Sequence, residues 1–117
     1  MIPLTGTARI FLYREPADMR KSFDGLSGLV REHMKADVFS GNLFVFVNKR
    51  RKLVKILYWS GDGFALWAKR LERGTFRIPQ TDTNRAELST AELSMLLESI
   101  TPLRVGRRYR REVATTG

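Results

Sequence analysis

The stretch LFVFVNKRRKLVKILYWSGDGFALWAKRLERGTFR, residues Leu43 to Arg77, alternates apolar runs with clusters of positive charge. Two apolar runs, Leu43–Val47 and Leu53–Trp59, are rich in β-branched and aromatic residues, which favour strands of a sheet. Between them lie Asn48 and four adjacent cations, a length typical of a hairpin loop. The stretch therefore predicts two antiparallel strands joined by a cationic turn.

A second turn is predicted at residues 60–63, SGDG, because its glycines permit positive φ and Asp62 can bond its own backbone. The next run, Phe64 to Leu71, has two interpretations. If its apolar residues are taken with a period of two, the run is a strand. If they are taken with a period of 3.6, the run is a short helix with Asp62 as N-cap and Gly74 as its C-terminal stop. We favour the strand, because a glycine-flanked turn directly after a strand returns the chain antiparallel.

The N-terminal part of the chain predicts one strand and one helix. The run RIFLY, Arg9 to Tyr13, is a short β-rich segment. Asp18 stands where an N-cap would, ahead of apolar residues spaced three and four apart, so we expect an amphipathic helix from Asp18 to about Lys35.

The C-terminal part predicts a loop and a second helix. Pro79 to Glu87 has little apolar content and is expected to connect elements. Ser89 and Glu92 have the spacing of a capping box, and leucines at helical spacing follow. Pro102 should end this helix within a turn.

Together these elements predict an α+β fold in a single domain, residues 1–103, followed by a basic, flexible tail, residues 104–117. The expected architecture is one antiparallel sheet of four or five strands with two helices packed on a face. The runs that begin at Arg9, Leu43, Leu53 and Phe64 supply four strands, and Thr75 to Ile78 is a candidate fifth.

The composition of the 117 residues excludes some chemistry. There is no cysteine, so disulfides, thiolate catalysis and cysteine zinc sites are excluded, and a reducing compartment is indicated. The sequence lacks a basic N-terminal region with a long apolar stretch, and no apolar run is long enough to span a bilayer. We therefore expect a cytoplasmic protein, with a nucleoid association possible in a bacterium, no membrane partner and no cofactor.

The formal charge of +9 is concentrated in two blocks. Between Lys49 and Arg77 there are nine Lys or Arg against Asp62 and Glu72, and Arg104 to Arg111 holds five arginines and no acid. Such clustering predicts attraction to polyanions, most commonly nucleic acid. The alternatives are a solvated surface on a basic protein and, less favoured, an anionic membrane.

Four segments resemble the TnpB accessory protein of the insertion sequence 66 family. They are DMRKSFDGL from Asp18, FSGNLFVFVNKRR from Phe39, KILYWSGDGFALWAKRLERGTF from Lys55, and the LLESI helix. The resemblance covers most of Arg9 to Ile100. It implies an auxiliary factor of DNA transposition, encoded beside a separate transposase that holds the acidic catalytic residues. The chain differs from the family pattern at Val38, Asn42 and Ala68.

An enzymatic function finds weak support in the sequence. Two-metal nucleases bring several carboxylates around ions about 4 Å apart, but Asp18 and Asp24 are six residues apart on one predicted helix. Asp37 and Asp62 fall in predicted turns. His33 is either a general base or a helix-surface or packed residue. We therefore predict a protein without catalytic or metal-binding residues.

The candidate nucleic-acid-binding residues are cations near the apolar runs and at the first helix. Arg20 and Lys21 would oppose the helix dipole, which a bound phosphate would explain, although two solvated charges cost only tenths of a kcal/mol. The full predicted set is Arg20, Lys21, Lys49, Arg50, Arg51, Lys52, Lys55, Lys69, Arg70, Arg73 and Arg77.

The aromatics Tyr58, Trp59, Phe64 and Trp67 lie among these cations in sequence, and they either stack on unpaired bases or form core. No base-reading motif is visible, so phosphate contacts should outweigh sequence readout. Two functions follow as hypotheses: a DNA-binding accessory factor, or a protein adaptor that docks the transposase or another element-encoded protein.

Overall fold

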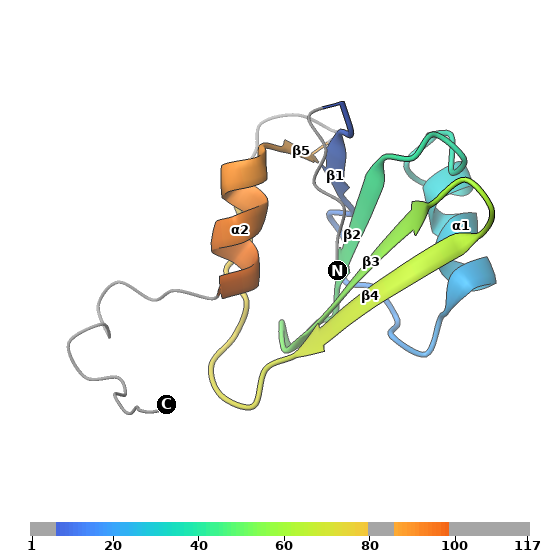
Figure 1. Cartoon of the computed structure of the whole chain (residues 1–117). Coiled ribbons are helices and arrows are strands. Elements are labelled where there is room, and N and C mark those ends of the chain that lie inside the picture. The colour runs from blue at the N-terminus through green and yellow to red at the C-terminus, as the bar shows by residue number, and fades with distance from the viewer. Residues whose placement is uncertain (1–6, 80–85, 99–117) are drawn as a thin grey trace.

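The computed structural model describes residues 7–79 and 86–98. One sheet contains all five strands, in the spatial order β4-β3-β2-β1-β5. The strands are β1 (Ile10–Leu12), β2 (Leu43–Val47), β3 (Leu53–Trp59), β4 (Phe64–Arg70) and β5 (Ala86–Leu88). The helices are α1 (Phe23–Glu32) and α2 (Thr90–Glu98). The predicted α+β class is confirmed (Figure 1).

The central hairpins agree with the sequence-based prediction. β2 and β3 pair antiparallel with Phe44 opposite Leu57, and β3 and β4 pair from Leu53 opposite Arg70 to Trp59 opposite Phe64. The residues from Phe64 therefore form a strand and not a helix. The turn at residues 60–63 returns the chain antiparallel, as predicted. The Ser60 N–H donates to the Gly63 carbonyl at 2.9 Å and closes this turn directly after β3.

β1 is the exception to antiparallel pairing. It pairs with β2 in parallel, Ile10 opposite Leu43, and with β5 antiparallel. The chain between β1 and β2 passes through α1, and a connection of this kind is what parallel neighbours require. The sheet is therefore mixed, although it is mostly antiparallel.

The two helices cover opposite faces of the sheet, not one face as predicted. Leu26 and Val30 of α1 pack with Phe44 and Phe46 of β2, whereas Leu93 and Leu96 of α2 pack with the other face. All five residues of β2 are buried, and a central strand that is apolar on both faces needs a cover on each. The unbroken LFVFV run was the signal for this arrangement.

The first helix begins later than predicted. α1 starts at Phe23 with Ser22 as N-cap, and that cap makes no side-chain hydrogen bond. Asp18 instead accepts a hydrogen bond from the Arg20 backbone N–H at 3.0 Å and starts a separate turn, closed by the Lys21 N–H on the Asp18 carbonyl. Short polar side chains at such positions favour local turns as readily as helix caps.

The fifth strand also differs from prediction. The segment from Thr75 to Ile78 is not a strand, and Phe76 is fully buried against the core. β5 lies instead in the stretch expected to be a loop. Three residues are too few to show a clear period, which is why the pattern missed it.

The second helix agrees with prediction at its start. The Glu92 N–H donates to Ser89 Oγ at 3.0 Å, and the Ser89 N–H donates to Glu92 Oε1 at 2.7 Å, so the capping box is formed. The predicted end of this helix and the predicted tail, residues 104–117, lie outside the described residues.

Candidate nucleic-acid interface

The turn between β2 and β3 is closed by Asn48. Its Oδ1 accepts the N–H groups of Lys52 at 2.9 Å and Leu53 at 3.0 Å, and its carbonyl accepts the Arg51 N–H at 2.9 Å. Arg51 adopts φ 58°, a left-handed conformation that glycine usually supplies. Lys49, Arg50 and Arg51 are exposed as a result.

The segment after β4 is hydrogen-bonded to this turn. The Leu71 N–H donates to the Lys52 carbonyl at 2.8 Å, and the Phe76 N–H donates to the Arg51 carbonyl at 2.7 Å. Lys52 Nζ donates to the Gly74 carbonyl at 2.8 Å. Two basic segments that are separate in sequence, residues 49–52 and 69–77, therefore meet at one end of the sheet. We call this end the basic end; its exposed cations are Lys49, Arg50, Arg51, Arg70, Arg73 and Arg77.

The acid Glu72 neutralises the basic end little. Glu72 lies 3.5 Å from Arg70, and both side chains are at least 74% exposed. Exposed pairs of this kind contribute at most about 1 kcal/mol and dissociate easily. The Arg70–Glu72 pair therefore costs little to break when a polyanion binds.

Arg20 and Lys21 do not lie in the first turn of α1, where they were predicted. They precede the N-cap, and Arg20 pairs with Asp18 at 2.7 Å. The hydrogen bond from the Arg20 side chain holds the pKa of the Asp18 carboxyl well below its usual range, and the pKa of Arg20 is raised by the same bond. Both residues are exposed.

Besides Lys52, two further predicted cations are used within the fold. Lys55 Nζ donates to the carbonyls of Met19 at 2.8 Å and Lys21 at 3.0 Å, which ties the turn before α1 to β3. Lys69 Nζ donates to the Leu97 carbonyl at 2.8 Å, near the C-terminal end of α2, where a cation complements the helix dipole. These two lysines stabilise the fold, and their ammonium groups are only partly available to a ligand.

A hollow of about 280 Å³ beside the basic end is lined by the acid Glu15 and by a cation that the sequence did not single out, Arg14. It shares the hollow with Lys49 and Arg51 because β1 runs parallel to β2, so both strands end on the same side. The parallel pairing was not predicted, and without it nothing in the sequence joined Arg14 to the turn.

The predicted aromatics do not lie with the cations. Tyr58 and Trp67 pack against the core on the α2 face. Trp59 and Phe64 lie at the opposite end of β3 and β4, with ring centroids 5.0 Å apart. Phe39, which is 57% exposed, contacts both of them. The side chains of Phe39, Trp59 and Phe64 form what we call the aromatic end.

The carboxylates suggested for catalysis are dispersed. Asp37 accepts the Phe39 N–H at 2.9 Å, and Asp62 lies 3.3 Å from Ser60 Oγ, so both serve turns. Within the described ranges no group of three or more His, Cys, Asp or Glu side chains could hold a metal ion. The same part of the chain contains no helix with the length and hydropathy needed to cross a bilayer.

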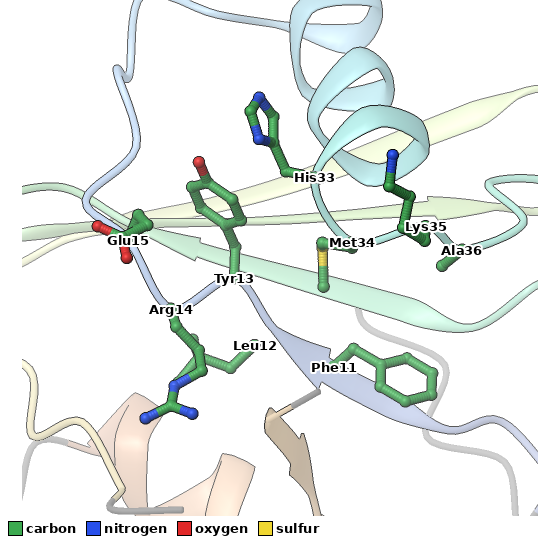
Figure 2. A pocket seen from close by; sticks show the side chains of 9 residues that line it. All are labelled: Phe11, Leu12, Tyr13, Arg14, Glu15, His33, Met34, Lys35 and Ala36. Atoms are coloured by element: carbon green, nitrogen blue, oxygen red, sulfur yellow. The ribbon is translucent and has the colours of Figure 1, made fainter. Parts of the chain in front are cut away.

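His33 lines a larger hollow, about 590 Å³, between the end of α1 and the end of β1. Its ring lies edge-on to Tyr13, with centroids 6.3 Å apart. Figure 2 shows these two rings side by side, with Arg14 pointing away from them. His33 therefore lies at the surface of a hollow, beside an aromatic ring and not beside a carboxylate pair.

The fold and this basic end describe a small α+β protein suited to contact with a polyanion. The chain matches, over residues 8–107, the family described as "IS66 Orf2 like protein". It therefore belongs to the IS66 Orf2-like family, which confirms the resemblance. Membership implies an accessory role associated with an insertion sequence and with its transposition machinery.

Two relatives come from Sinorhizobium fredii (strain NBRC 101917 / NGR234), and both are named as uncharacterized. The protein y4hO is 36% identical over 100 residues, covering 86% of this chain and 87% of the relative. The protein y4jC is 35% identical over 100 residues, covering 86% of each. No solved structure matches this chain.

Proposed function

We propose that this protein is a non-catalytic accessory factor of transposition that binds DNA through phosphate contacts, beside a separate transposase. The observation that supports this proposal most is that the hydrogen bonds of Leu71, Phe76 and Lys52 join two basic segments, residues 49–52 and 69–77. Like charges held together repel each other, and a polyanion relieves that repulsion.

The contacts should be to the phosphate backbone. The exposed cations lie on turns and loops, apart from Arg70 at the end of β4, and the described residues offer no helix that projects a row of polar side chains from the basic end. Phosphate contacts carry no base information, so binding should depend on salt more than on sequence. Specificity for an element end would then come from the transposase.

The test is a gel shift on element ends and on random duplex at several salt concentrations. We expect similar affinity for both and steep weakening as salt rises. A DNA affinity that did not change with salt concentration would contradict the proposal. Metal-dependent cutting of either DNA, abolished in an Asp62→Ala variant, would contradict the non-catalytic part.

A matched pair of double variants locates the contact. Lys49→Gln with Arg50→Gln removes two charges from the basic end. Arg31→Gln with Lys35→Gln removes two exposed charges from the end of α1 instead. The first variant should weaken binding and the second should change it little; equal weakening would mean that net charge alone drives association.

The alternative function is a protein adaptor, and one observation favours it. Phe39, an exposed aromatic in contact with Trp59 and Phe64, is the kind of apolar surface that partners bury. A Phe39→Ala variant that failed in a transposase pull-down while DNA binding stayed intact would favour the adaptor.

A further inference from the structure

The open edge of β4 is the largest unpartnered backbone surface among the described residues. β4 pairs with β3 on one side, and no described segment pairs with its other side (Figure 1). It is seven residues long and contains no proline. Edge strands of this length are usually protected, because their free N–H and C=O groups can pair with another strand.

Two hydrogen bonds fix which backbone groups point outward. The Ser60 N–H bonds the Gly63 carbonyl, and the Leu71 N–H bonds the Lys52 carbonyl. Hydrogen-bonded pairs alternate along an antiparallel ladder, so Ala65, Trp67 and Lys69 bond inward to β3. The outward groups belong to the alternate residues, Phe64, Leu66, Ala68 and Arg70.

We propose that β4 pairs antiparallel with β4 of a second copy, centred on Trp67, to form a two-fold dimer with a continuous sheet. Among the two-fold registers that bond outward groups to outward groups, the one centred on Trp67 pairs the whole of Phe64–Arg70. Leu66 then bonds Ala68 of the second copy, and Phe64 bonds Arg70.

The side chains suit this register. Arg70 lies opposite Phe64 of the other copy, a favourable pairing of a cation with an aromatic ring. Lys69 lies opposite Ala65 of the second copy, so no two like charges face each other. Trp67 lies opposite Trp67 of the second copy. Trp67 is only partly buried in one copy and would gain cover.

Helix α1 does not obstruct this pairing. α1 packs on β2 as well as on β3 and β4, so its axis lies no nearer the open edge than the space between β3 and β4. With strands about 4.8 Å apart, the two-fold axis would set the two α1 axes at least roughly 10 Å apart, no closer than packed helices. The dimer would point its two basic ends in opposite directions, because the paired strands are antiparallel.

Sedimentation velocity without DNA tests the dimer independently of the proposed function. We expect wild-type protein to pass from monomer to dimer as concentration rises. Ala65→Glu should tighten the dimer about threefold to tenfold, since the new carboxylate faces Lys69, and Ala65→Lys should weaken it by a similar factor. A monomer up to the solubility limit, or equal behaviour of both variants, would overturn the proposal.

Cysteine cross-linking tests the register. The sequence has no native cysteine, so an introduced cysteine is the only thiol in each chain. Trp67→Cys places two thiols in a non-hydrogen-bonded pair with Cα atoms about 4.5 Å apart, within disulfide range. Ala65→Cys places them far apart and is the matched control. The register is supported if Trp67→Cys forms the intermolecular disulfide efficiently and Ala65→Cys does not. It is contradicted if the two variants cross-link equally well or if Ala65→Cys cross-links better. A strand of the transposase that protects β4 of a monomeric chain would also contradict it.

Discussion

Strand β3 has a tight turn at each end, the β2–β3 turn at the basic end and the β3–β4 turn at the aromatic end, yet the surroundings of the two turns differ in chemistry. At the basic end, Asn48 closes the turn and leaves Lys49 and Arg50 in solvent. At the other end, Ser60 closes the turn and the aromatic rings of Trp59 and Phe64 pack beside it. Charged side chains that point into solvent from a hydrogen-bonded turn can bind a ligand without any change to the fold. Aromatic rings packed beside a turn contribute to folding first, so the two ends should respond to mutation in different ways.

The largest expected effect on stability is at the aromatic end. Trp59→Ala removes a partly buried ring that contacts Phe39 and Phe64. We expect the free energy of unfolding to fall by about 2–3 kcal/mol, below the range for a fully buried Trp. Urea denaturation measures this change. DNA affinity of the folded variant should be unchanged, and a large drop in affinity would mean that the aromatic end also contacts DNA.

A smaller decrease in stability is expected for Lys55→Met. The variant keeps the apolar stem but cannot make the two hydrogen bonds to the carbonyls of Met19 and Lys21. We expect a decrease of about 1–3 kcal/mol, because both bonds are charge-assisted and the bond to the Met19 carbonyl is partly buried. Hydrogen exchange should increase in the turn before α1. An unchanged denaturation midpoint would show that Lys55 does not hold this turn.

Arg51→Gly should change stability and affinity in opposite directions. Relief of the left-handed conformation at φ 58° should raise stability by up to about 1 kcal/mol. Removal of one cation from the phosphate backbone should make the salt dependence of DNA binding shallower by about 0.9 in log-log slope. Arg51→Gln is the control, because it removes the charge and keeps the strain. If Arg51→Gly bound DNA more tightly than wild type, Arg51 would not be a phosphate contact.

The smallest expected effect concerns Asp18. Its pKa is lowered in the folded state by the hydrogen bond from Arg20, so its contribution to stability is present when the carboxyl is ionised. That contribution should be complete above about pH 4, the usual pKa of Asp, and should disappear as the pH falls through the lower folded value. Asp18→Asn should therefore lower the melting temperature slightly at pH 7, and the difference from wild type should shrink below pH 4 or so. A difference that grows in acid would have the wrong sign.

The sequence was informative wherever a pattern was local. The apolar runs of β2 and β3 and the capping box at Ser89 and Glu92 were predicted from spacing alone, and the structure confirms them. The start of α1 was missed because Asp18 bonds its near neighbours instead of capping the helix. Local patterns cannot choose between those two uses of one carboxylate.

The candidate interface was predicted in part. The cationic turn could be read from the sequence, but its contact with the segment around Gly74 and Phe76 depends on long-range hydrogen bonds. Lys55 and Lys69 were predicted to contact the ligand, and only the fold shows that their ammonium groups bond backbone carbonyls. Arg14 was missed because it reaches the basic end through parallel pairing between β1 and β2.

Salt titration of DNA binding, on wild type and on a variant with Lys49, Arg50, Arg51 and Lys52 all replaced by Gln, tests the central claim most directly. The variant loses the Lys52 Nζ bond to the Gly74 carbonyl but keeps the backbone bonds of Leu71 and Phe76 and the turn closed by Asn48, so circular dichroism should show an intact fold. The account predicts a linear log-log plot for wild type and a shallower one for the variant on every DNA sequence, by about 0.9 for each phosphate that the variant no longer neutralises. Parallel plots of equal affinity would contradict it.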